Sequence, residues 1–146
     1  MQFITSNILP ITIALFSGTM LLWSLIGNRI RGIKEVDCIA ALQLINHKSA
    51  LVLDVREDKE YQDGHVLNAR LIPLGKLGER IGELEKYKEQ PIVVACRSGN
   101  RSAAACALLG KQGFAQAYNL AGGMLAWQKA SLPVEKQSAE KSKGKR

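Results

Sequence analysis

The sequence predicts an α/β fold, with a parallel sheet flanked by helices, preceded by one transmembrane helix. Short apolar runs typical of buried strands alternate with helix-like segments between residues 33 and 132, and this alternation favours a parallel sheet. Residues 1–28 contain no charged side chain. Residues 133–146 are polar and rich in lysine, which is typical of a disordered tail. We therefore expect an N-terminal helix, one globular domain and a basic tail.

The stretch 8–26 predicts the membrane span, since about 20 apolar residues cross the hydrocarbon core of a bilayer. Trp23 lies near one end of this stretch, where an indole ring suits the membrane interface. A cleaved signal peptide is the alternative interpretation. The segment has no basic start and no clean small-residue cleavage site after it, so we favour a retained single-pass helix.

Basic residues after the span predict its orientation. Arg29, Arg31 and Lys34 follow the span at once, which predicts that the C-terminal domain lies in the cytoplasm under the positive-inside rule. We expect the membrane to be the bacterial inner membrane.

The three cysteines have no paired spacing and independently indicate free thiols in a reducing compartment. Neither His47 nor His65 is a near neighbour of a cysteine, so we expect no metal site and no other cofactor.

The first half of the domain is predicted in chain order as follows. Residues 33–36 form a short strand, and an aspartate begins the next segment, 37–46, as a good N-cap for a helix. The continuous apolar run 50–55 predicts a strand that is buried on both faces. Residues 57–62 predict a short helix, and 70–74 predict a strand that ends near a proline.

The second half of the domain continues the alternation. Residues 77–88 have a helical composition, although two glycines weaken the pattern. Residues 91–95 predict the central strand, and 101–112 predict a helix that a following glycine closes. Residues 117–120 predict the last strand, and 124–130 a final helix after a Gly-Gly turn.

The most informative feature is the loop that begins at Cys96, between the central strand and the helix 101–112. The thiol is expected above a helix N-terminus, where unpaired N–H groups and the helix dipole stabilise an anion. Arg97 and Arg101 add fixed positive charge. The sequence therefore predicts a thiol with a depressed pKa that acts as a nucleophile.

Several ordered motifs accompany this loop. They are Leu53-Asp54-Val55-Arg56, Glu60-Tyr61, Gly64-His65-Val66, Ile72-Pro73-Leu74, Cys96-Arg97-Ser98-Gly99-Asn100-Arg101-Ser102, Gly113-Phe114 and Asn119-Leu120-Ala121-Gly122-Gly123-Met124 before Trp127. Together they resemble a single-domain rhodanese (sulfurtransferase) module from about residue 36 to residue 132. The resemblance implies that Cys96 takes sulfane sulfur from a donor such as thiosulfate, becomes a persulfide, and passes the sulfur to cyanide or a thiol.

The length of the loop separates this family from cysteine phosphatases. Phosphatases use a C-x5-R loop, whereas Cys96 and Arg101 form C-x4-R, and the resemblance links this smaller cradle with sulfur substrates. It implies that Cys96 is catalytic and that the rest of the loop binds the small anionic donor. The expected substrate-binding residues are Arg97, Ser98, Gly99, Asn100 and Arg101. An alternative role for Arg101 is to brace the loop.

Three further motif residues have supporting roles in this interpretation. Asp54 is expected to orient loops by hydrogen bonding. Arg56 is expected to pair with Glu60 or another carboxylate, and a catalytic role for Arg56 is the alternative. His65 is expected to be structural or to line the site. Cys106 lies among alanines in a predicted helix and is expected to be buried and inert; a resolving cysteine is the alternative.

The partners expected are a small sulfur-donor anion, a thiol or cyanide acceptor, and the membrane through the N-terminal helix. Nucleic acid is not expected, because no aromatic residues interleave with the lysines of the tail. Two alternatives to a small-molecule sulfurtransferase stay open. One is a membrane-tethered persulfide carrier that serves a protein donor or acceptor. The other is a membrane-tethered binding module.

Overall fold

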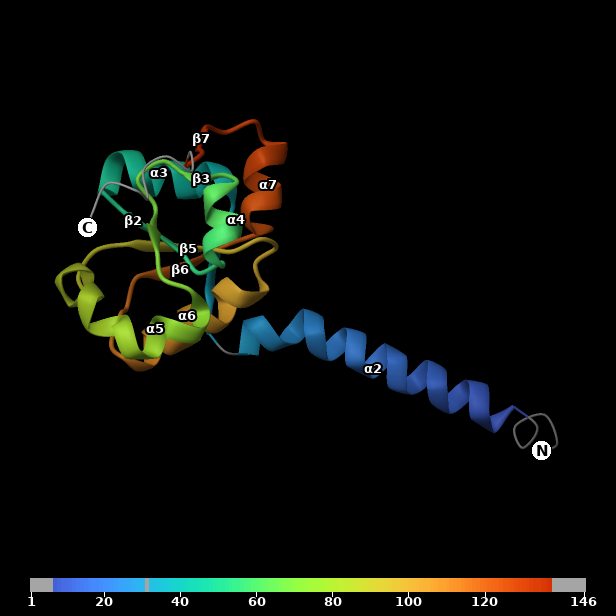
Figure 1. The fold of residues 1–146 in the computed structure, drawn as a ribbon. Coiled ribbons are helices and arrows are strands. Elements are labelled where there is room, and N and C mark those ends of the chain that lie inside the picture. The colour runs from blue at the N-terminus through green and yellow to red at the C-terminus, as the bar shows by residue number, and fades with distance from the viewer. Residues whose placement is uncertain (1–6, 31, 138–146) are drawn as a thin grey trace. The chain divides into compact units, whose positions relative to one another are not determined.

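The structure is a computed structural model that describes residues 7–30 and 32–137. The chain divides into two compact units, Met1–Gly32 and Ile33–Arg146. The described part of the first unit is dominated by one helix, α2 (Ile8–Ile30), of 23 residues (Figure 1). The second unit contains every other helix and strand of the described residues.

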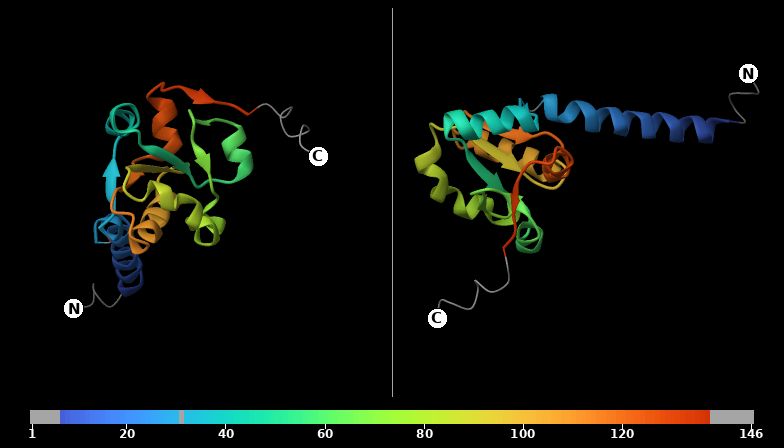
Figure 2. Two further views of the ribbon diagram at one scale, coloured as in Figure 1. Left: turned by 90° about the vertical axis from the view of Figure 1, so that its left-hand side faces the viewer. Right: turned by 90° about the horizontal axis from the view of Figure 1, so that it is seen from above.

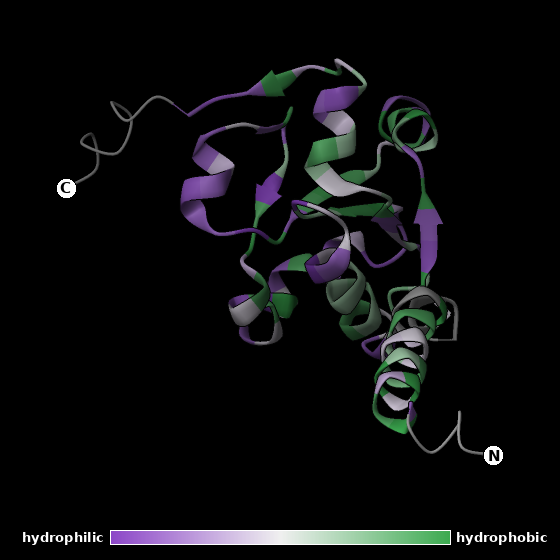
Figure 3. Cartoon of the chain, turned by 90° about the vertical axis from the view of Figure 1, so that its right-hand side faces the viewer, coloured by the Kyte–Doolittle hydropathy of each residue, from purple (hydrophilic) through white to green (hydrophobic). Residues whose placement is uncertain are grey.

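Helix α2 is coloured largely as hydrophobic by residue hydropathy, with polar residues interspersed (Figure 3). Its large hydrophobic residues that the structure describes are exposed, from 40% for Ile11 to 77% for Trp23. Within the described residues, however, no helix combines the length and the apolarity needed to cross a membrane. The predicted membrane span over 8–26 is thus not supported; the side chains at positions 24 and 25 of that stretch lie outside the described residues.

The second unit is built on a five-stranded parallel sheet with the order β1-β6-β5-β2-β4. The strands are β1 (Lys34–Val36), β2 (Leu51–Asp54), β4 (Arg70–Leu71), β5 (Ile92–Ala95) and β6 (Ala117–Leu120). This confirms the predicted parallel sheet and its five strands. Strand β4 ends before Pro73, which has no N–H group to donate to a neighbouring strand.

Helices cover both faces of this sheet, with α3 and α7 on one side and α5 and α6 on the other (Figures 1 and 2). They are α3 (Cys38–Lys48), α4 (Asp58–Gln62), α5 (Leu74–Arg80), the 3-10 helix η1 (Ile81–Tyr87), α6 (Asn100–Lys111) and α7 (Gly123–Lys129). Asp37 caps α3 as predicted, since its Oδ1 accepts from the N–H of Ala40 at 2.7 Å.

Two segments differ from the prediction. The helix expected over 77–88 begins earlier, at Leu74, and its second half is the 3-10 helix η1; glycine within this segment weakens the α-helix. The segment 133–146, expected to be disordered, contains β7 (Val134–Glu135), which pairs antiparallel with β3 (His65–Val66). Val134 packs against the core, and this apolar contact holds the start of the tail; residues 138–146 lie outside the described chain.

The core positions the cysteine loop through β5, the central strand, all of whose residues are buried. Val94 packs in one cluster, with Leu77, Leu84 and Leu109. Val93 packs in the cluster on the opposite face, which includes Trp127, as the alternation of side chains along a strand requires. Cys96 follows β5 directly and so lies at the carboxyl end of the sheet, where parallel α/β folds bind ligands.

Candidate active site

The Cys96 loop joins β5 to α6 through a single left-handed residue. Gly99 has a φ of 103° and precedes the first residue of α6, Asn100. This conformation favours glycine, and the N–H of Gly99 donates to Cys96 Sγ at 3.0 Å. The loop therefore holds sulfur next to a backbone donor at the N-terminus of a 12-residue helix.

The environment of Cys96 stabilises its thiolate. Burial alone raises the pKa of the thiol, since the residue is only 1% exposed. Hydrogen bonds from the Ser102 hydroxyl and from the N–H groups of Ser102, Gly99 and Ser98 outweigh this effect and hold the pKa below its ordinary value. The predicted depression of the pKa is confirmed in direction.

Helix α7 packs its first turn directly on the cysteine loop. The N–H of Met124 donates to the Cys96 carbonyl at 2.8 Å, and that of Leu125 to the Arg97 carbonyl at 3.1 Å. A Cβ on Gly123 would lie 2.5 Å from the first carbonyl oxygen and 2.6 Å from the second. The Gly-Gly pair, which the sequence indicated only as a turn, thus permits the close approach of α7 to the loop.

Arg101 is engaged in an ion pair. Its Nη1 and Nη2 each donate to a carboxylate oxygen of Glu60 at 2.8 Å. The hydrogen bond from Arg101 is the main cause that lowers the pKa of Glu60 to about 2. This geometry favours the bracing role for Arg101, because the pair ties the start of α6 to α4 and neutralises the guanidinium charge.

Arg56 pairs with Asp54 rather than with Glu60. Its Nη2 lies 2.7 Å from Asp54 Oδ2 and also donates to the Gly64 carbonyl at 2.7 Å. Asp54 is 1% exposed and Arg56 5%. The predicted structural role of both residues agrees with this geometry, in which the buried pair holds the chain between β2 and β3.

His65 is buried and both of its ring nitrogens have protein neighbours. Nδ1 lies 2.7 Å from the Tyr61 carbonyl oxygen, and Nε2 lies 3.4 Å from a carboxylate oxygen of Glu135. The imidazole stacks on the Tyr61 ring with a centroid distance of 3.6 Å. These contacts connect β3 to α4 and β7, in line with the structural role expected from the sequence.

The solvent-facing side of the loop carries Arg97, Ser98 and Asn100. Arg97 and Asn100 are exposed. Among the described residues, the side chain of Arg97 has no hydrogen bond or ion pair. Of the two loop arginines, Arg101 is therefore paired with Glu60, whereas Arg97 is exposed and has no ion-pair partner among the described residues.

A buried polar network behind the loop was missed by sequence reasoning. Ser102 Oγ lies 3.2 Å from Cys96 Sγ and donates to Asn119 Oδ1 at 2.5 Å. Asn119 Nδ2 donates in turn to the Gly99 carbonyl at 3.1 Å. The only signal in the sequence was a polar residue within the apolar strand 117–120, which lies beside β5 in the sheet.

The two other cysteines are buried free thiols. Cys106 is buried as predicted, and burial raises the pKa of its thiol to about 12. Burial also raises the pKa of Cys38, and the negative charge of Asp37 adds to this effect.

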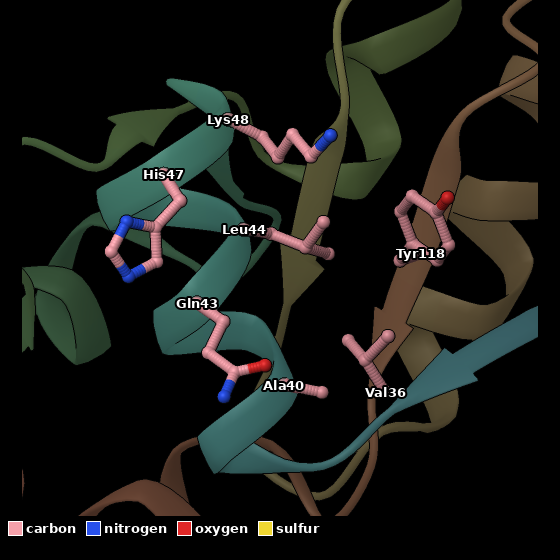
Figure 4. Close-up of a pocket in the computed structure, with 7 residues that line it drawn as sticks. All are labelled: Val36, Ala40, Gln43, Leu44, His47, Lys48 and Tyr118. Carbon is pink, nitrogen blue, oxygen red and sulfur yellow. The ribbon is translucent and has the colours of Figure 1, made fainter.

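A separate pocket of about 350 Å³ lies between α3 and the strands β1 and β6 (Figure 4). Its lining residues are Val36, Ala40, Gln43, Leu44, His47, Lys48 and Tyr118. None of them belongs to the loop 96–102 or to the network behind it, so this pocket is not part of the cysteine site.

Comparison with known proteins agrees with the geometry. The family model of the rhodanese-like domain matches residues 39–130. A sulfurtransferase of Allochromatium vinosum is 34% identical over 103 residues, which cover 70% of this chain and 94% of that protein. The thiosulfate sulfurtransferase GlpE of Vibrio cholerae is 32% identical, covering 69% of this chain and 93% of the relative.

A solved structure extends the similarity to three dimensions. The crystal structure of a rhodanese-related protein from Thermoplasma volcanium superimposes with a TM-score of 0.61 at 34% identity. The match covers 70% of this chain and 97% of the other.

Proposed function

The chain belongs to the rhodanese-like domain family, and we propose that it is a sulfurtransferase that carries sulfane sulfur as a persulfide on Cys96. The observation that carries this proposal is the Cys96 thiol itself. It accepts a 3.0 Å hydrogen bond from the Gly99 N–H at a helix N-terminus and has a lowered pKa. A thiolate in such a position is the reactive form of a nucleophilic cysteine.

The proposed reaction has two steps. The Cys96 thiolate attacks the outer sulfur of thiosulfate, the S–S bond of the donor breaks, and sulfite leaves with the bonding electron pair. Cyanide or a thiolate then attacks the terminal sulfur of the persulfide. The persulfide S–S bond breaks, thiocyanate or a new persulfide leaves, and Cys96 returns to the thiolate.

The loop residues have distinct roles in this proposal. Backbone N–H groups of residues 98, 99 and 102 stabilise the anionic sulfur. Arg97 attracts the anionic donor, because its guanidinium is exposed and has no ion-pair partner among the described residues. Arg101 keeps the loop in place through Glu60. Thiosulfate is supported as donor by the similarity to the Vibrio cholerae relative.

Intact-mass measurement of the full chain after incubation with thiosulfate tests this proposal. We expect one added sulfur atom in the unmodified chain and in Cys106→Ser, a matched control that removes an inert thiol. We expect none in Cys96→Ser. Cyanide should then remove the sulfur and release thiocyanate.

Other outcomes of that measurement distinguish the alternatives. An adduct that cyanide does not remove, but that a protein thiol does, favours a persulfide carrier for a protein partner. No adduct in a folded, reduced sample contradicts thiosulfate as donor and favours a binding module.

We further propose that α2 attaches the chain to the bacterial inner membrane, with the rhodanese-like domain in the cytoplasm. Support comes from the exposed apolar side chains along α2 and from the basic residues Arg29, Arg31 and Lys34 near its end. We expect the full chain to sediment with membranes after alkaline carbonate washing, and a chain that starts at residue 33 to stay in the supernatant. Release of the full chain by carbonate would contradict the attachment.

A further inference from the structure

Asn119 is a buried amide whose hydrogen bonds determine which way it faces. The side chain lies in β6 and is 1% exposed. Its Nδ2 donates to the Gly99 carbonyl at 3.1 Å and to a Glu35 carboxylate oxygen at 3.4 Å. Both partners can only accept, so the NH₂ group must lie on their side and Oδ1 must face Ser102.

The Ser102 hydroxyl can therefore donate only one hydrogen bond, and two neighbouring atoms can accept it, Asn119 Oδ1 and Cys96 Sγ. Ser102 is 0% exposed, and its Oγ lies 2.5 Å from Asn119 Oδ1 and 3.2 Å from Cys96 Sγ. While Cys96 is a thiol, its S–H donates to Ser102 Oγ, and the Ser102 O–H donates to Asn119, so every group is satisfied. Once the thiol has lost its proton to water, Cys96 Sγ and Asn119 Oδ1 compete for the single hydrogen bond that the Ser102 hydroxyl can donate.

We propose that Asn119 is a positioning residue that acts on Cys96 through the Ser102 hydroxyl. By accepting the hydrogen bond of the Ser102 hydroxyl, Asn119 makes that hydrogen bond less available to the thiolate and so limits the ionisation that the loop otherwise promotes. When the sulfur becomes anionic, the hydroxyl turns from Oδ1 to Sγ, and Asn119 gives up one hydrogen bond. Asn119 thus sets how readily the nucleophile forms.

This inference deepens the proposed sulfur transfer and rests on it only for the effect on turnover. Thiol protonation can be measured without any sulfur donor. The charged and titratable groups around the thiol come from the loop and from the elements packed on it. They are Arg97 of the loop, Arg101 and Cys106 of α6, Glu60 of α4 and Glu35 of β1. A substitution of Asn119 leaves all of them in the chain.

The test is the pH dependence of Cys96 alkylation by iodoacetamide in the full chain, read at the Cys96 peptide by mass spectrometry. Asn119→Leu has a similar volume but cannot accept a hydrogen bond, so the Ser102 proton becomes available to the thiolate. We expect the measured pKa of Cys96 to fall by about one unit, the size of one hydrogen bond to a charged group. Ser102→Ala should raise it, because the donor is lost.

The decisive comparison is Asn119→Leu in the Ser102→Ala background, where we expect no further shift. An equal shift in both backgrounds would show that Asn119 acts through loop packing and would overturn the inference. An unchanged or raised pKa in Asn119→Leu alone would overturn it as well. Should circular dichroism show that Asn119→Leu does not fold, Asn119→Ser is read by the same criteria, since its shorter side chain no longer reaches Ser102.

Failure of this inference is distinguishable from failure of the proposed function. A chain whose pKa shifts follow the expected pattern, but which gains no sulfur from thiosulfate, contradicts sulfur transfer from that donor and leaves the role of Asn119 intact.

Discussion

Hydrogen bonding distinguishes Cys96 from the two other cysteines, although all three are buried. Burial raises the pKa of Cys38 and of Cys106, the latter to about 12. At Cys96 the same effect is outweighed by the Ser102 hydroxyl and by backbone N–H groups. Hydrogen bonds from Ser102 and from the loop N–H groups therefore hold the pKa of this thiol below its ordinary value despite its burial.

This difference predicts selective alkylation. In the folded full chain at neutral pH, we expect iodoacetamide to modify Cys96 and to leave Cys38 and Cys106 unmodified. Peptide mapping by mass spectrometry checks this, and denaturation in urea should expose all three thiols to the reagent. Modification of Cys106 at a rate similar to that of Cys96 would show that hydrogen bonding does not set the reactivity of these thiols.

Gly123 predicts a second effect of a single residue. In Gly123→Ala the new methyl group would lie 2.5 Å from the Cys96 carbonyl oxygen, at a φ of 57° that alanine adopts with strain. We expect a loss of unfolding free energy of about 1–3 kcal/mol and a higher measured pKa for Cys96, because the loop must move. Urea denaturation and pH-dependent alkylation measure the two effects.

Gly110→Ala is the matched control for that substitution. Gly110 lies inside α6 and a Cβ there meets nothing within 4 Å. Alanine should stabilise the helix by up to about 1 kcal/mol and leave the Cys96 pKa unchanged. Equal effects of the two substitutions would mean that the close approach of α7 does not shape the loop.

The short helix α4 contributes a contact that holds the start of α6 in place. It is only five residues long, yet its Glu60 holds Arg101 at the start of α6 by two hydrogen bonds of 2.8 Å. Glu60 also accepts from the N–H of Glu57, which completes a capping box at the start of α4. One carboxylate thus caps the start of its own helix and braces the Cys96 loop through Arg101.

This brace predicts a pH-dependent contribution to stability. The pKa of Glu60 is about 2 in the folded protein against 4.5 for a free glutamate, so the pair stabilises the fold fully above about pH 4.5 and loses this contribution as the pH falls toward 2. Glu60→Gln should lower the unfolding free energy at neutral pH by about 1 kcal/mol, since the pair is partly exposed to solvent. Urea titrations should show that this difference shrinks at low pH; a difference that is constant with pH would rule out the ionised pair as its cause.

The sequence predicted the five strands of the parallel sheet, the thiol and its loop because each depends on local pattern, but it missed the two-residue strands β3 and β7. Apolar runs identified the strands β2 and β5, and the residues around Cys96 identified a strand, a loop and a helix. The partners of Arg101 and Ser102 could not be predicted in the same way. Glu60 lies 41 positions before Arg101, and Asn119 lies 17 after Ser102, so only the folded sheet brings these groups together.

Across the whole chain, positive charge is concentrated outside the domain that contains Cys96. The net charge is +7, but residues 33–132 contain 13 basic and 11 acidic side chains, which leaves +2. The remainder comes from two arginines after the apolar stretch and from the C-terminal tail. The general electrostatic field of the domain is therefore weak, and we expect the attraction of an anionic donor to depend on the local charge of Arg97.

This distribution predicts how salt affects the proposed reaction. The rate constant for sulfur uptake from thiosulfate should fall severalfold between about 0.01 M and about 0.15 M salt, as the screening length shortens. Arg97→Gln should lower the rate at low salt and remove most of the salt dependence, whereas a chain that ends at residue 137 should behave as the full chain does. Alkylation of Cys96 by neutral iodoacetamide provides the control, because an uncharged reagent is not attracted by Arg97. If removal of the tail, and not Arg97→Gln, abolished the salt dependence, the overall charge would direct the donor and the local role of Arg97 would be wrong.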